Sequence, residues 1–444
     1  MKLTYYNNTS VLVENNNKKI LFDPWLVGKT YYGSWTIFPK LDINIEDFKD
    51  IDYIHISHIH PDHCHIPTLE QIPNNVPILI HKWDDKFVKR NLERIGKKVI
   101  ELEHGEKFKL NKEFYLYVYA ADDCNPEECF KFIGCGKIGD PNKSVGIDTF
   151  SLLKSSKKTI MQINDCQYPL TMRTLHKIKK EFKDIDLMMV GYTGAGSYPQ
   201  CWSDYTDDEK LNKYGAVKRQ KFLDWGMGFM NIIKPKNYIP YAGTYTLCGF
   251  LSHLEKFKVT PELPEALKYY QNNYKEGFGL LLNPEESFDL NSNKPSSPYK
   301  HYDPKKRIEY IENILCNEKY EYEYDNTVTL QDIENNISLA YSRYNSKRKE
   351  LNFKTDTNIY IHLPENKLLK ISANGSGYDI INEKDFKDNK FVKYKIHFNL
   401  LNRLLKGPRY AHWNNAEIGS HIEFSRKPEI YERKLYYSMN FFHA

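Results

Sequence analysis

The stretch Ile51-Asp52-Tyr53-Ile54-His55-Ile56-Ser57-His58-Ile59-His60-Pro61-Asp62-His63 carries the strongest structural signal in this sequence. Its first half, up to Ser57, is a short apolar run of the kind that forms a buried strand. Its second half belongs to a histidine cluster, because five of the fifteen histidines of the chain lie between positions 55 and 65. A uniform scatter would place roughly 0.4 histidines in that window, so the cluster needs a chemical explanation.

The spacing of these side chains predicts a metal site. The turn after the strand would project His58 and His60 toward one side, with Asp62 and His63 one step further along. Imidazole and carboxylate groups at this density suit zinc or iron, and the spacing allows two groups of ligands for two divalent metals. A histidine-rich surface loop or a set of core histidines is the structural alternative. Two histidines fall outside the pattern and are expected to be structural or to support the ligands: His55 and His65.

Apolar strand-like runs alternate with amphipathic helical stretches in the first 255 residues. The runs lie at residues 3–13, 20–22, 51–57, 76–80, 99–102, 114–120, 147–153, 159–163, 185–190 and 238–241. Helical periodicity at 84–95 and 171–182 separates some of them. This alternation predicts a layered α/β architecture.

The remaining sequence predicts an extension of different character. Residues 261–273 have a helical pattern, as residues 207–233 of the first part also do, and the Asn-, Ser- and Pro-rich segment 284–302 predicts a linker. Helices and then strands are expected beyond it. We therefore expect a catalytic domain at 1–255, a helical extension and linker at 256–330, and a C-terminal α+β region at 331–444.

Composition excludes several functional classes. The chain has 444 residues, of which 41% are hydrophobic, and this is enough to bury a core. The net charge of +5 is small and its basic residues are scattered, so no nucleic-acid partner is expected. No apolar run is long enough for a membrane span, and the N-terminus lacks an apolar signal-peptide core. The predicted location is the cytoplasm, where cysteines are expected as free thiols or metal ligands.

The histidine string and the turn Asp23-Pro24-Trp25 resemble the metallo-β-lactamase superfamily. The resemblance implies an αββα four-layer sandwich with metals at the sheet edges, here with a C-terminal α+β extension. A narrower resemblance is to the metallo-β-lactamase part of the CMP-N-acetylneuraminate hydroxylase family, and it rests on segments in the same order: Asp23–Gly28, Ile56–His63, Asn164–Cys166, Pro240–Gly243, Ile418–Gly419 and Arg426–Tyr431. That family also has a Rieske domain, whose Cys-x-His and Cys-x-x-His ligand pairs do not occur in this sequence.

The resemblance implies further ligands. Asp165 follows the apolar run 159–163, where the superfamily places a bridging aspartate, although a turn aspartate is the alternative. Superfamily hydrolases carry a histidine after the run 114–120, and here Asp122 is the best substitute, with Asp123 second. His253 is the candidate for the last ligand, with a helix-surface histidine as the alternative. Exchanging imidazole for carboxylate favours iron or manganese over zinc.

Other polar clusters compete with or complement this site. Four cysteines could ligate a second metal or an iron–sulfur cluster, or be inert and buried: Cys124, Cys129, Cys135 and Cys166. In the glycine-rich loop 191–200, Gly194, Gly196 and Tyr198 are the predicted substrate contacts, because glycines let backbone amides approach a ligand; a tight structural turn is the alternative. The stretch 412–420 could close over a substrate or pack against the main domain.

Two functions follow from these expectations. The narrower resemblance implies an iron-dependent oxygenase acting on a sugar or sugar nucleotide in cell-surface glycan biosynthesis, with electrons from a separate protein. The broader one implies a two-metal, zinc-dependent hydrolase of an ester, amide or phosphodiester bond. In either case Asp62 and Asp165 are the catalytic candidates, and a small-molecule substrate is expected. A scaffold or lipid-binding protein with a relic site is a third, non-catalytic alternative.

Overall fold

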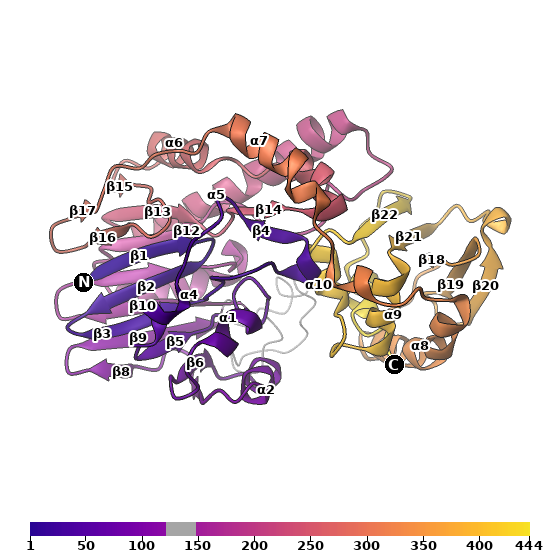
Figure 1. Cartoon of the computed structure of the whole chain (residues 1–444), viewed down its shortest axis with the longest axis horizontal. Helices are drawn as coiled ribbons and strands as arrows, with labels where there is room; N and C mark the ends of the chain where they lie inside the picture. The colour runs from indigo at the N-terminus through magenta and orange to yellow at the C-terminus, as the bar shows by residue number, and fades with distance from the viewer. Residues whose placement is uncertain (121–147) are drawn as a thin grey trace.

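Two β-sheets packed face to face dominate the N-terminal part of the computed structural model, which describes residues 1–120 and 148–444 (Figure 1). The first sheet has the strand order β17 (Lys294–Pro295), β16 (Ser287–Asp289), β1 (Lys2–Asn7), β2 (Ser10–Asn15), β3 (Lys18–Phe22), β5 (Tyr53–His55), β6 (Ile78–His81) and β7 (Val99–Leu102). The second has the order β15 (Phe278–Gly279), β13 (Asn237–Tyr241), β12 (Leu187–Gly191), β11 (Thr159–Gln162), β10 (Thr149–Ser155), β9 (Phe114–Ala120) and β8 (Phe108–Asn111).

The alternation of side chains along the strands explains the layers. In β2, Val11 and Val13 face the second sheet, whereas Leu12 belongs to the core on the opposite face. From the second sheet, Leu116 and Val118 enter the same inter-sheet core. Each sheet therefore buries both of its faces.

Helices cover the outer face of each sheet. Helices α1 (Ile66–Gln71) and α2 (Phe87–Arg94) pack on the first sheet. Helices α4 (Tyr168–Glu181), α5 (Gly215–Ile233) and α6 (Leu263–Asn273) pack on the second. The order helix, sheet, sheet, helix is the αββα sandwich, so the predicted α/β metallo-β-lactamase fold is confirmed.

Parallel strands bring the functional loops to one edge of the sandwich. Strands β3, β5, β6 and β7 are parallel in the first sheet, and β11, β12 and β13 are parallel in the second. The carboxyl end of β5 leads into the histidine string, and that of β11 leads to Asp165. Loops at this end of parallel strands meet, which creates a place for a site.

The C-terminal region forms a third sheet of order β20 (Gly377–Asn382), β19 (Lys367–Ser372), β18 (Asn358–Leu363), β21 (Phe391–Ile396) and β22 (Ile422–Lys427). Its helices are α8 (Leu330–Glu350), α9 (Phe398–Lys406), α10 (Trp413–Ile418) and α11 (Arg433–Met439). One continuous core joins this region to the two-stranded sheet of β4 (Trp35–Ile37) and β14 (Tyr245–Leu247). Trp202 stacks on Phe424 with ring centroids 5.2 Å apart. The C-terminal region therefore packs directly against the sandwich.

The segment 284–302, which its composition predicts to be a linker, instead forms an edge of the first sheet. Strand β16 pairs with β1, and β17 pairs with β16. Short, polar, proline-containing strands are typical of sheet edges, so the composition reflects an edge rather than a connection. The division at residues 255 and 330 remains a proposal, and this pairing would move its first boundary to Pro295.

The remaining elements connect these layers. They are α7 (Pro304–Asn313) and the short helices η1 (Tyr31–Gly33), η2 (Ile45–Phe48), η4 (Glu209–Tyr214), η5 (Gly249–Phe257), η6 (Leu315–Asn317), η7 (Glu321–Tyr324) and η8 (Glu383–Asp385). Among the described residues, no helix combines the length and apolarity that a membrane crossing requires.

We expect Leu116→Ala to lower the free energy of unfolding by about 2–5 kcal/mol, because Leu116 is fully buried between the sheets and the substitution leaves a cavity. Leu339→Ala is the matched control, since Leu339 is 52% exposed on α8 and should change stability by less than about 0.5 kcal/mol. Urea unfolding followed by circular dichroism measures both. Equal losses in the two variants would contradict the inter-sheet core.

Candidate metal centre

The buried carboxylate of Asp23 organises the loop that follows β5. It accepts hydrogen bonds from the backbone N–H and the hydroxyl of Ser57, each at 2.7 Å. The N–H of Asp23 in turn donates to the carbonyl of His55 at 2.9 Å. Asp23 has a positive φ of 42°, a conformation that aspartate tolerates better than most residues. The turn after β3 thus ties together the ends of two parallel strands.

A first group of possible ligands contains His58, His60 and Asp148. His58 Nε2 lies 2.9 Å from His60 Nδ1 and 3.8 Å from Asp148 Oδ1. One ligand atom from each residue falls within 4.8 Å of the other two. Two imidazoles and a carboxylate at these separations can converge on one cation.

A second group contains His63 and Asp165, with His58 shared and Asp62 adjacent. His63 Nε2 lies 3.5 Å from Asp62 Oδ2 and 3.5 Å from Asp165 Oδ2. His63 Nδ1 pairs with Asp23 Oδ2 at 2.9 Å, which orients the ring. His63 Nε2 is buried and has no hydrogen-bond partner among the described residues. A buried ring nitrogen that has no hydrogen-bond partner and faces two carboxylates is suited to bind a metal ion.

Asp62 is held by residues outside the histidine string. Asn8, in the turn between β1 and β2, donates to Asp62 Oδ2 at 3.0 Å. The Tyr31 hydroxyl donates to Asp62 Oδ1 at 2.6 Å. Both oxygens of this buried carboxylate are therefore fixed in direction.

The charges of the two groups favour a cation. Burial lowers the pKa of His58 well below its usual value, and His63 and His60 act in the same direction. Burial opposes protonation of His63 too, but Asp62, Asp165 and Asp23 outweigh it and raise the pKa of His63 well above its usual value. At Asp165 burial is outweighed by His63, which lowers the pKa of the carboxyl. The carboxylates around His63 and the unprotonated ring of His58 form an environment that suits a divalent metal, which would take the place of the proton on His63.

The C-terminal region reaches this site through α10. His60 Nε2 lies 2.9 Å from Asn414 Oδ1, so the ring donates there and leaves Nδ1 for a metal. His421 Nε2 pairs with the carbonyl oxygen of Tyr31 at 2.7 Å, and Tyr31 holds Asp62. Residues more than 350 positions away in sequence thus support two of the predicted ligands.

A cavity of about 190 Å³ opens beside the ligands. Its walls come from both sheets' loops and from α10, and they are Asn8, Tyr31, Trp35, His60, Asp62, Asp148, Asp165, Gln167, Thr193, Gly194, Ala195, Phe222, Ala242, Gly243, Tyr245 and Ile418. Asp165 is the most accessible of the carboxylates, with 34% of its side chain exposed. A space of this size suits a reacting group and small co-reactants.

The predicted site residues fall into three groups: those that lie together, those outside the described residues, and those that lie elsewhere. His58, His60, Asp62, His63 and Asp165 come together as described. Asp122, Asp123, Cys124, Cys129 and Cys135 lie outside the described residues. Cys166 is buried in the core between the second sheet and its helices.

His253 and part of the glycine-rich loop lie elsewhere. His253 is exposed on η5, where its Nδ1 pairs with the carbonyl oxygen of Phe250 at 2.6 Å, and it lines another cavity. The prediction of His253 as a ligand is corrected accordingly, because η5 carries it away from β13. Gly194 lines the metal cavity, but Tyr198 packs among Trp202, Tyr205 and Tyr214, and Gly196 is absent from the described cavity wall.

Asp148 is the ligand candidate that the sequence analysis missed. It directly precedes β10, and β10 pairs antiparallel with β9 so that Thr149 lies opposite Ala120. Pairing therefore brings Asp148 to the position expected for a residue that follows β9. The signal was present in Ile147-Asp148-Thr149, an acidic residue at the start of an apolar strand, but only the pairing register reveals it.

Comparison with known proteins supports the superfamily resemblance. Residues 2–207 match the family model described as a beta-lactamase superfamily domain. The cytidine monophosphate-N-acetylneuraminic acid hydroxylase of Asterias rubens is 25% identical over 285 residues, which cover 62% of this chain and 39% of the relative. The chain thus spans about two fifths of that relative's length.

Solved structures of similar shape include proteins of different activity. An isothiocyanate hydrolase from Delia radicum gut bacteria has a TM-score of 0.45 and 14% identity, covering 65% of this chain and 99% of that one. The diiron β-hydroxylase CmlA from Streptomyces venezuelae has a TM-score of 0.42 and 14% identity, covering 65% and 53%.

We expect Asp148→Asn to lower metal binding, because an amide is a weaker ligand and removes a negative charge from the first group. Mass spectrometry of metal content after dialysis should give fewer ions per chain than in the unmodified protein. Asp84→Asn, at an exposed position, is the matched control and should leave the content unchanged. An unchanged content in Asp148→Asn would remove Asp148 from the ligand set.

Asn414→Ala should weaken metal binding by about 10- to 100-fold, because it removes the acceptor that orients His60. Calorimetric titration of the metal-free protein measures this. Asn414→Asp retains a carbonyl-type oxygen and should restore much of the affinity, whereas Asn335→Ala, exposed on α8, should have no effect. Unchanged affinity in Asn414→Ala would show that α10 only packs beside the site.

Proposed function

We propose that the chain, whose residues 2–207 match the family model described as a beta-lactamase superfamily domain, is a metal-dependent enzyme with two divalent metals. One metal would be held by His58, His60 and Asp148 and the other by His63 and Asp165 with His58 nearby. Asp62, fixed by Asn8 and Tyr31, would complete the second set.

We propose further that the enzyme is an iron-dependent oxygenase acting on a sugar or sugar nucleotide, in cell-surface glycan biosynthesis. The observation that carries this proposal is a carboxylate, Asp148, beside His58 and His60 where superfamily hydrolases carry a third histidine. Carboxylate oxygen is a harder ligand than imidazole and favours iron or manganese over zinc. The hydroxylase relative supports the same choice.

The residues of this chain would bind and orient the reactants. Bound iron would supply the redox chemistry that converts a C–H bond, dioxygen, two electrons and two protons to an alcohol and water. Trp35 and Tyr245 stack with ring centroids 3.4 Å apart and form an aromatic wall that limits water in the cavity. Asp165, partly exposed, is placed to orient a reacting group. The electrons would come from a separate cytoplasmic protein.

A zinc-dependent hydrolase of an ester, amide or phosphodiester bond is the second candidate. The partial exposure of Asp165 at the cavity favours it, because such a carboxylate can orient an attacking water. In that case bound zinc would polarise the scissile bond. The same residues serve both chemistries, so metal identity and the need for electrons decide between them.

Protein purified without chelators should contain iron, and product formation should need dioxygen and a reductant. With a chemical reductant, substrate and air, we expect one round of product, and sustained turnover only after an electron-transfer protein is added. Metal analysis and product assays in air and under strict anaerobiosis measure this. Two zinc ions per chain, with steady turnover in the absence of oxygen and electron donor, would establish the hydrolase instead.

A further inference from the structure

A second and larger cavity adjoins the metal cavity. Its volume is about 930 Å³, within the range of pockets that hold drug-sized ligands. The two cavities share Gly243 and Tyr245 in their walls, so they lie on either side of the segment that joins β13 to β14. The proposed metal chemistry uses no charged side chain of this larger cavity.

A buried group of charges forms one side of the cavity. Lys258 and Arg307 both pair with the carboxylate of Glu255, Lys258 at 2.9 Å. Their side chains are only 6% and 17% exposed, and that of Glu255 is 10% exposed. Arg307 also donates to the Thr246 hydroxyl at 3.1 Å. Two cations thus share the single buried carboxylate of Glu255, which by itself balances only one of their two charges.

The carboxylate of Glu262 forms only a long ion pair with Arg307. Glu262 Oε1 lies 3.9 Å from Arg307 Nη1, beyond hydrogen-bond distance, and Glu262 accepts a hydrogen bond from the Tyr302 hydroxyl. Counted over the whole lining, five Lys and Arg side chains face three Glu side chains. The cavity therefore has a surplus of positive charge, and an arginine fork suits a carboxylate or a phosphate.

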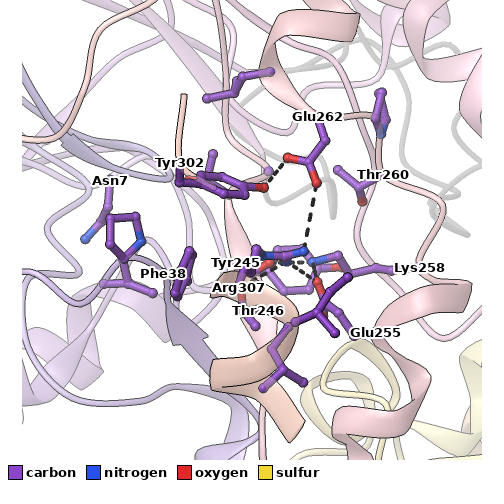
Figure 2. A pocket seen from close by; sticks show the side chains of 18 of the residues that line it. Asn7, Phe38, Tyr245, Thr246, Glu255, Lys258, Thr260, Glu262, Tyr302 and Arg307 are labelled. Carbon is purple, nitrogen blue, oxygen red and sulfur yellow. Dashed lines mark hydrogen bonds and ion pairs between the residues drawn. The ribbon is translucent and has the colours of Figure 1, made fainter. Parts of the chain in front are cut away.

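Aromatic rings form the facing wall. Figure 2 shows Phe38 near Tyr302, and the two ring centroids are 5.4 Å apart; the guanidinium carbon of Arg307 lies 5.8 Å from the centroid of the Tyr302 ring. Tyr192 and Tyr245, both buried, add to the lining. Asn7 also lines the cavity and is 2% exposed, and its buried Oδ1 has no partner among the described residues. The wall suits a flat or cyclic group, and Asn7 offers an acceptor to a hydroxyl or amino group.

We propose that this cavity binds a small organic anion built on a ring, with its carboxylate or phosphate on Arg307 and its ring against Phe38 and Tyr302. A carboxylated sugar and a nucleotide both have this chemistry. The identification of this ligand as the substrate rests on the proposed function. It is suggested by the position of the cavity, which borders the metal cavity at Gly243 and Tyr245. The binding itself does not depend on metal.

The test is calorimetric titration of the metal-free full chain with two matched pairs of probes. Glucuronate is compared with glucose, and adenosine 5′-monophosphate with adenosine. In at least one pair we expect the anion to bind 10-fold or more tightly than its neutral counterpart, because only the anion can form a charge-assisted hydrogen bond with Arg307. A difference between glucuronate and glucose would indicate a sugar carboxylate, and a difference between adenosine 5′-monophosphate and adenosine would indicate a nucleotide phosphate. Absence of anion binding, or equal binding within both pairs, would overturn the proposal.

Variants locate the binding within the cavity. Arg307→Lys keeps the charge for Glu255 but removes the fork, and should weaken anion binding about 10-fold or more. Arg403→Lys is the matched control, because Arg403 pairs with Asp325 in the C-terminal part and should bind normally. Phe38→Leu should weaken the binding of both probes in the responding pair. This variant becomes the test if Arg307→Lys does not fold. Unchanged affinity in folded Arg307→Lys or Phe38→Leu would place the ligand elsewhere.

Because these titrations contain no metal, they fail separately from the proposed function. If the protein proves to need neither iron nor dioxygen, the oxygenase proposal fails, but anion binding in this cavity is still expected. Conversely, a protein that holds iron but binds neither anion would keep the oxygenase proposal and refute only the role of this cavity.

Discussion

The buried carboxylate of Asp23 is the constraint on which the candidate metal centre depends. It binds Ser57 through backbone and side chain, and it pairs with His63 on the nitrogen that faces away from the site. A buried carboxylate with fewer partners would be costly, so its hydrogen bonds hold the loop in one arrangement. The same loop carries every histidine of the two ligand groups. The geometry of the centre thus follows from one turn between two parallel strands.

Local patterns were sufficient for much of the fold and for part of the centre. The apolar run before His58 became β5, and the helical periodicity at 84–95 became α2, because each pattern matches the burial of one element. The histidine string is compact in sequence and therefore visible without a structure. Asp148 was not visible, because its position depends on the register between β9 and β10. The edge pairing of 287–295 was missed for the same reason, since its partner β1 begins at Lys2.

The contribution of the C-terminal region could not be predicted from local sequence. Asn414 and His421 follow no metal-binding pattern, and their partners His60 and Tyr31 lie at the other end of the chain. A continuous aromatic and aliphatic core holds the two parts together, so α10 reaches the centre on a rigid support. The sandwich carries the predicted ligands, and the C-terminal region restricts the orientation of His60 and of Tyr31, which holds Asp62.

The contact between His60 and Asn414 also determines when, during synthesis and folding, the site can take its final geometry. During synthesis, the histidine string leaves the ribosome long before α10, and domains tend to fold as they emerge. His60 would lack its acceptor during this interval, and its ring could bind a metal through either nitrogen. Only after residue 414 has emerged can the orientation become unique. The ligand geometry around His60 can therefore become final only after the region that contains α10 has folded against the sandwich.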